Sequence, residues 1–129
     1  MNIGIDIMGG DFAPDAALEG VALALNAWAG EMHITLFGQE KLLHSFADAH
    51  KELASNLSFV PCEEIILMGS SPVRALQEKP DSSIAVGLNH LSEGKIDAFC
   101  SAGNTGAMLV GAVLKTGVVR DDLRPCLLS

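Results

Sequence analysis

The segment Ser101-Ala102-Gly103-Asn104-Thr105-Gly106-Ala107 contains the residue types that most clearly indicate chemistry. Glycines let backbone amides approach a ligand, and a helix that begins here adds unpaired N–H groups and the positive end of its dipole. Side chains that donate hydrogen bonds stand beside these amides. The segment therefore predicts a site for phosphate or for a developing oxyanion. Asn104 and Ser101 are the candidate catalytic residues, and Gly103, Thr105 and Gly106 are the candidate anion-binding residues.

The same segment could instead be a tight turn whose glycines only allow a strand and a helix to pack closely. Ser101 does not stand in a G-x-S-x-G nucleophile elbow, and no histidine is placed to act as its base. We therefore interpret Ser101 as a supporting residue and not as a covalent nucleophile.

A second segment, Asp6-Ile7-Met8-Gly9-Gly10-Asp11, places one carboxylate at the end of an expected strand and another beyond a double glycine. It is either a tight loop that faces a ligand, with Asp6 or Asp11 positioning the substrate or a cation, or a turn in which Asp11 caps a helix. The candidate binding residues of this loop are Asp6, Gly9, Gly10 and Asp11. The pattern is not G-x-G-x-x-G, so a dinucleotide site has little support.

A third segment, Lys79-Pro80-Asp81-Ser82-Ser83, places a cation and two hydroxyls just before a helix. Lys79, Ser82 and Ser83 could form a second contact to an anion, because lysine acts as a point charge toward phosphate. The alternative is a solvated loop in which a serine caps the helix.

Composition limits the classes of function that fit this chain. Its 129 residues are 49% hydrophobic and 19% charged, which predicts one folded domain with a hydrophobic core. The formal net charge of −8 argues against a nucleic-acid surface. A local cradle of amides and one or two cations can still bind an anion on an acidic protein.

Cysteine and histidine spacing predicts neither a metal site nor a cofactor. Cys62, Cys100 and Cys126 stand in apolar contexts, so we expect buried free thiols in a reducing compartment. Asp6 and Asp11 interrupt the stretch where a signal peptide would need an apolar core, and no apolar run is long enough to span a bilayer. We expect a cytoplasmic protein.

Strands and helices are expected to alternate along the chain. Apolar runs predict strands at 3–7, 33–37, 57–60 and 96–100. Helical spacing predicts a helix from Pro14 to Gly30 with the apolar stripe Leu18, Val21, Leu25 and Trp28, and further helices at 42–53, 73–77, 84–91 and 108–114, with Asp81 or Ser82 as the cap of the fourth. This order implies a layered α/β/α fold with a mostly parallel sheet, in which ligands bind at the carboxyl ends of the strands.

The end of the chain, Pro125-Cys126-Leu127-Leu128-Ser129, is similar to the opening of another buried strand. We therefore expect residues 1–129 to be the N-terminal α/β portion of a longer protein.

Taken in order, the three segments and Arg124-Pro125 resemble PlsX-type phosphate acyltransferases, and the resemblance runs the length of the chain. It implies a Rossmann-like fold akin to phosphotransacetylases and to isocitrate and isopropylmalate dehydrogenases. It also implies conversion of acyl-[acyl carrier protein] and inorganic phosphate to acyl phosphate and free carrier protein, in phospholipid synthesis. The implied assembly is a homodimer, with peripheral membrane association of the full-length enzyme through C-terminal segments.

Two rival functions remain open. One is a short-chain phosphotransacetylase that uses acyl-coenzyme A, and the other is a non-catalytic Rossmann-like module that tethers partners in lipid synthesis. We expect residues 1–129 alone to be inactive, because the second half of the cleft would be missing.

Overall fold

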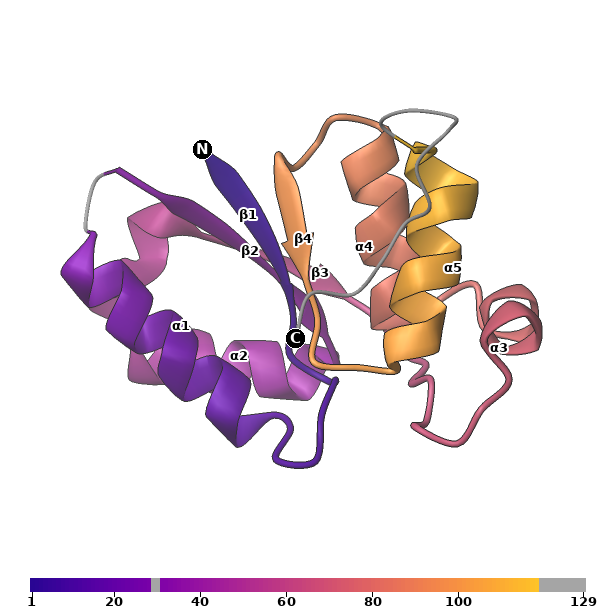
Figure 1. Ribbon diagram of the computed structural model, residues 1–129. Helices are drawn as coiled ribbons and strands as arrows, with labels where there is room; N and C mark the ends of the chain where they lie inside the picture. Colours follow the sequence, from indigo (N-terminus) through magenta and orange to yellow (C-terminus); the bar gives the residue numbers. More distant parts are fainter. Residues whose placement is uncertain (29–30, 119–129) are drawn as a thin grey trace.

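Four parallel strands form the centre of the computed structural model, which describes residues 1–28 and 31–118 (Figure 1). The strand order is β3-β2-β1-β4. The strands are β1 (Asn2–Asp6), β2 (His33–Gly38), β3 (Leu57–Pro61) and β4 (Ala98–Cys100). Strand β1 pairs with β2 from Asn2↔His33 to Asp6↔Phe37 and with β4 from Ile3↔Ala98 to Ile5↔Cys100. The parallel sheet that the sequence predicted is confirmed.

Helices cover the two faces of the sheet separately. Helices α1 (Asp15–Ala27) and α2 (Glu40–Ala49) lie on one side, and α4 (Ser83–Ser92) and α5 (Thr105–Thr116) lie on the other (Figure 1). The short helix α3 (Pro72–Glu78) packs against α5 on the side away from the sheet, and a 3-10 helix, η1 (Lys51–Asn56), precedes β3. The layered α/β/α architecture is therefore confirmed.

A separate hydrophobic cluster holds each helical layer to the sheet. Val21 and Leu25 of α1 and Phe46 of α2 pack against buried residues of β2. On the other face, Ile84 and Leu88 of α4 pack with Ala107 of α5. Each helix turns one apolar stripe inward, which is the source of most helix stability in a folded protein.

Three expectations differ from the structure. The helix expected at 42–53 stops at Ala49, and His50 joins it to η1, so one predicted helix is two. Trp28 follows the last residue of α1, where the backbone leaves the helical conformation, and the side chain is 54% exposed and not on the buried stripe. Cys100 is exposed, whereas Cys62 is buried as expected. The predicted helix end at Gly30, the Arg124-Pro125 segment and Cys126 lie outside the described residues.

The layer arrangement changes between β1 and β4. The loop after β1 leads to α1 on one face, and the loop after β4 leads to α5 on the other (Figure 1). Such a switch point opens a crevice at the carboxyl ends of the strands, where α/β proteins bind ligands. Both glycine segments that the sequence singled out lie at this position.

Candidate anion-binding site

Asp6, at the end of β1, joins the two glycine segments. Its Oδ1 accepts a hydrogen bond from the Met8 N–H at 2.8 Å, and its Oδ2 accepts one from the Ser101 hydroxyl at 2.6 Å. The carboxyl is 3% exposed, and burial raises its pKa, while hydrogen bonds from Ser101 and then Ser83 lower it. Asp6 therefore fixes the loop after β4 to the loop after β1.

The two loops touch through their glycines. A Cβ at Gly9 would lie 2.6 Å from the Gly103 carbonyl oxygen and 2.9 Å from the Ser101 Oγ, so no larger residue fits without moving the loop. Gly103 has a φ of +136°, which L side chains rarely adopt. The sequence therefore places glycine where backbone meets backbone and where the loop must turn toward α5.

Asn104 is the cap that starts α5. Its Oδ1 accepts from the Ala107 N–H at 3.1 Å, and its Nδ2 donates to the carbonyls of Leu67, Met68 and Ser70 at 3.0, 3.1 and 3.2 Å. The side chain is buried, and both ends of its amide are bonded to protein. In this geometry Asn104 shapes the site and has no donor directed at a ligand, which differs from the direct donation expected from the sequence.

The amides of Thr105 and Gly106 stand at the start of α5. Within residues 1–28 and 31–118, neither N–H has a hydrogen-bond acceptor. Thr105 is exposed and Gly106 is half-buried. Unpaired N–H groups at a helix start attract anions, and here the helix dipole adds to them.

Three further residues that the sequence predicted for the site have different positions in the structure. Ser83 is buried and its side chain bonds to Asp6, so it supports the site from the start of α4. Asp11 is exposed at the rim of the crevice and does not cap α1, whose first residue follows Pro14 without a side-chain cap. Ser82 is fully buried: it accepts from the Ala85 N–H at 3.3 Å and donates to the Lys79 carbonyl. Ser82 is thus the cap of α4 and does not reach a ligand.

Lys79 directly follows α3 and lines a neighbouring hollow with Ser70 and Ser71. Its Nζ donates to the Ile65 carbonyl at 2.6 Å. An ammonium has three donors, so two remain for a ligand on that side. The structure does not place Lys79 with Asp6 and the glycine loops.

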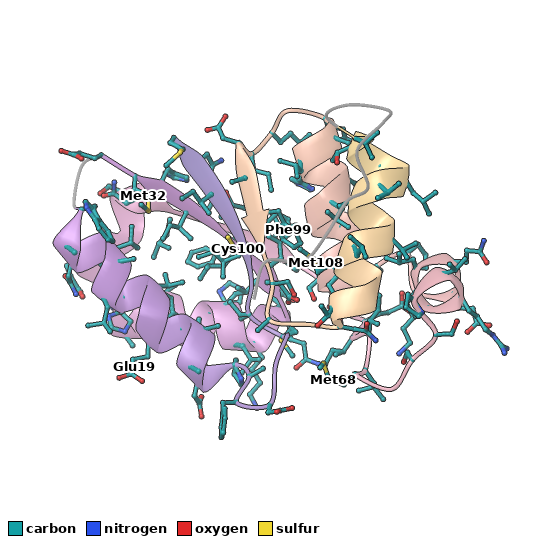
Figure 2. The ribbon with its side chains drawn as sticks, viewed as in Figure 1. Glu19, Met32, Met68, Phe99, Cys100 and Met108 are labelled. Atoms are coloured by element: carbon teal, nitrogen blue, oxygen red, sulfur yellow. The ribbon has the colours of Figure 1, made fainter. Side chains whose placement is uncertain are left out.

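The sequence interpretation overlooked the loop that Asn104 holds. Met68 is 56% exposed, and its Sδ would lie 2.7 Å from a Cβ at Gly103 (Figure 2). By contrast, Phe99 of β4 and Met108 of α5 are partly buried and pack against the hydrophobic cluster that contains Ala107 (Figure 2). A lone methionine in a turn-rich segment carries no sequence signal for a position beside the site.

Among the described residues, no three His, Cys, Asp or Glu side chains gather where they could bind a metal ion. In the same part of the chain, none of the helices has the length and apolar character needed to cross a bilayer.

The fold and the site define an α/β protein with two glycine loops at its switch point and, among the described residues, amides without an acceptor at the start of α5. The chain belongs to the family described as "Fatty acid synthesis protein", whose model matches residues 1–129.

Named relatives agree with this family. The chain is 44% identical over 127 residues to a phosphate acyltransferase of Caldicellulosiruptor bescii, covering 98% of this chain and 38% of the relative. It is 40% identical to the phosphate acyltransferase of Lysinibacillus sphaericus and 36% identical to that of Clostridium botulinum, with 98% of this chain and 37% and 38% of those relatives covered. The chain thus spans less than two fifths of the length of the curated relatives that it matches.

Proposed function

We propose that the protein is a phosphate acyltransferase, which converts acyl-[acyl carrier protein] and inorganic phosphate to acyl phosphate and free carrier protein. The family match and the names of the relatives support the reaction class. The carrier-protein substrate and a role in phospholipid synthesis are part of the proposal. So are a homodimer, a cytoplasmic location and peripheral membrane association of the full-length enzyme.

One observation carries the proposal at this site: the N–H groups of Thr105 and Gly106 at the start of α5 have no acceptor among the described residues, and the loop before them is bonded to Asp6 through Ser101. Acyl transfer to phosphate needs donors for an anion in the ground state and for an oxyanion in the transition state. Preorganised amides serve either need, because they do not have to reorient during the reaction.

The proposed chemistry requires neither a strong base nor a metal. A phosphate oxygen attacks the thioester carbonyl carbon, and the tetrahedral oxyanion collapses as the C–S bond breaks. The thiolate leaves and ends as the thiol, and the proton that hydrogen phosphate loses on becoming acyl phosphate balances the one that the thiolate gains. A thiol pKa of about 8.5 makes the thiolate a good leaving group. The protein has to hold phosphate against the thioester and stabilise the oxyanion.

We assign the roles accordingly. The amides of Thr105 and Gly106 hold phosphate or the oxyanion. Asp6 and Ser101 fix the two loops, and Asn104 fixes the start of α5, so these three are positioning residues. Lys79 remains a proposed source of positive charge on the α3 side.

The reaction itself is tested on the complete protein as its gene encodes it. Acyl phosphate formed from inorganic phosphate can be trapped with hydroxylamine. Acyl thioesters of the carrier protein and of coenzyme A, from acetyl to palmitoyl, are compared as substrates. We expect turnover with long-chain carrier thioesters. Turnover with acetyl-coenzyme A alone would favour the phosphotransacetylase, and no turnover with any thioester would favour the non-catalytic module.

A pair of variants at Thr105 tests the amide. Thr105→Pro removes the N–H but suits the first residue of a helix, a position that Pro72 already occupies in α3. Thr105→Ala removes only the hydroxyl. We expect Thr105→Pro to lower kcat/KM for phosphate by roughly a hundredfold, as loss of one oxyanion donor does, and Thr105→Ala to stay within about threefold of the unchanged protein.

Equal activity of Thr105→Pro and the unchanged protein would remove this amide from the site. Circular dichroism of both variants verifies that α5 still forms.

A further inference from the structure

Two adjoining hollows lie between the start of α1 and the end of β4. One, of about 260 Å³, is lined by Ile5, Asp6, Ala17, Cys100, Ser101 and Ala102. The other, of about 300 Å³, is lined by Gly9, Gly10, Asp11, Phe12, Ala16, Ala17 and Ala102. Because Ala17 and Ala102 line both, the hollows form one continuous surface, which we call the α1 groove.

The walls of the α1 groove suit a narrow apolar ligand. Small side chains at Ala16, Ala17 and Ala102 leave the space open, and Ile5 contributes an apolar floor. Phe12 is 79% exposed at the rim, although burial of such a side chain is worth roughly 1.5–3 kcal/mol. A ligand that covers apolar surface here would recover part of that free energy.

The α1 groove is continuous with the candidate site. Asp6 and Ser101 line the first hollow, and Gly9 and Gly10 line the second, so the groove begins at the residues that join the two loops. It opens on the α1 side of the sheet, whereas the amides of Thr105 and Gly106 belong to α5 on the other side (Figure 1). A molecule whose carbonyl sits between the loops can therefore meet an anion on one side and extend an apolar tail on the other.

Charge in the groove favours the same class of ligand. Its ionisable carboxyls are Asp6, which is buried and bonded to Ser101, and Asp11 at the exposed rim. Both carboxyl groups would disfavour a negatively charged ligand group inside the groove, whereas an uncharged alkyl chain can lie beside them.

We propose that the α1 groove binds the part of the acyl chain next to the thioester carbonyl. This inference rests on the proposed function, since it names the subsite for the tail of that substrate. The groove then contributes to chain-length preference, because a longer chain covers more of its apolar wall.

Ala17→Leu tests the groove by filling it. The matched control is Ala27→Leu, the same change in the same helix at an exposed position that does not line the groove. In the complete protein, we expect Ala17→Leu to lower kcat/KM roughly tenfold for palmitoyl thioesters and less than twofold for acetyl thioesters. Ala27→Leu should leave both unchanged.

Alkylation of Cys100 supplies a readout that does not depend on turnover. This thiol lines the groove and is exposed (Figure 2). S-hexadecyl-coenzyme A, a thioether that cannot react, should slow alkylation of Cys100 by iodoacetamide at least about fivefold at saturation, the protection that occupancy of one site gives. Coenzyme A without the alkyl chain should not slow it.

Equal losses across chain lengths in Ala17→Leu, together with no protection of Cys100, would overturn the inference and indicate that another part of the protein covers this face. Failure of the proposed function looks different: the unchanged protein would form no acyl phosphate from any thioester, whereas the alkyl chain could still protect Cys100.

Discussion

Two connections lead from the end of a strand to the start of a helix on the face of the sheet that α4 and α5 cover. These two passages use similar residues differently. Residues 62–82 lead from β3 to α4, and residues 101–104 lead from β4 to α5. Each ends in a polar cap that accepts a hydrogen bond from the third residue of the helix, at 3.3 Å from Ala85 and 3.1 Å from Ala107.

Burial separates the two passages. At α4 the cap and the first two helical residues, Ser82, Ser83 and Ile84, are buried. At α5 the cap is buried, but Thr105 is exposed and its amide has no acceptor among the described residues. A polar cap before a helix therefore does not by itself identify an anion site, because what lies in front of the helix start decides whether a ligand can reach it.

The two cysteines give the largest expected contrast between the passages. Cys62 follows β3 and is buried, and this burial raises its pKa to about 12, whereas Cys100 ends β4 and is exposed. Because the thiolate is the reactive form, we expect iodoacetamide at pH 8 to alkylate Cys100 at least about a hundredfold faster than Cys62. Peptide mapping by mass spectrometry measures both rates, and in urea the two should converge. Similar rates in the folded protein would show that the β3–α4 passage is as open as the other.

Removal of the two caps should separate the passages by stability. Asn104→Ala loses a helix cap and three donations to the 67–70 loop, so we expect a loss of about 2–3 kcal/mol in free energy of unfolding. Ser82→Ala loses a cap worth about 1 kcal/mol, and the Lys79 carbonyl keeps its bond from the Ser82 N–H. Urea unfolding measures both, and equal losses would contradict the larger role of Asn104. Asn104→Asp, which keeps the cap but not the donations, separates the two contributions.

The smallest effect concerns the two serines that reach Asp6 from the two passages. The raised pKa of Asp6 means that the folded protein holds a proton that the unfolded chain has released, so this group lowers stability as pH rises from about 3.8. Hydrogen bonds from Ser101 and Ser83 oppose this rise in pKa, with Ser101 first in effect. We therefore expect Ser101→Ala, and less so Ser83→Ala, to destabilise the protein more at pH 7 than at pH 4. Unfolding curves at both pH values measure the difference, and a loss independent of pH would remove Asp6 as the group that both serines stabilise.

Much of the fold was predictable because strands and helices each leave a local pattern of apolar residues in the sequence. Apolar runs placed the four strands of the described residues, and helical spacing placed their helices to within a few residues. The break at His50 and the exposed side chain of Trp28 were missed, since both occur where a helix ends and its periodic pattern no longer applies. Cys100 looked buried because its neighbours are apolar, yet β4 is the outer strand of the described sheet.

The candidate site was predictable only in part. Glycine pairs and their flanking polar residues marked both loops, and parallel topology brought them to one edge of the sheet. No pattern in the sequence could show that the Asn104 side-chain amide donates hydrogen bonds to the 67–70 loop or that Ser82 is fully buried. No pattern could show either that Ala17 and Ala102 line one groove.

The sequence by itself determined the element order, the parallel sheet and the two glycine loops, because these depend on the periodicity and backbone preferences of neighbouring residues. The tertiary structure alone decided which polar groups remain free for a ligand. Every buried donor and acceptor must find a partner, and those partners come from distant segments, as Ser101 does for Asp6 and the 67–70 loop does for Asn104. The N–H groups of Thr105 and Gly106 remain free for a ligand because no described residue of the folded chain provides a hydrogen-bond acceptor for them.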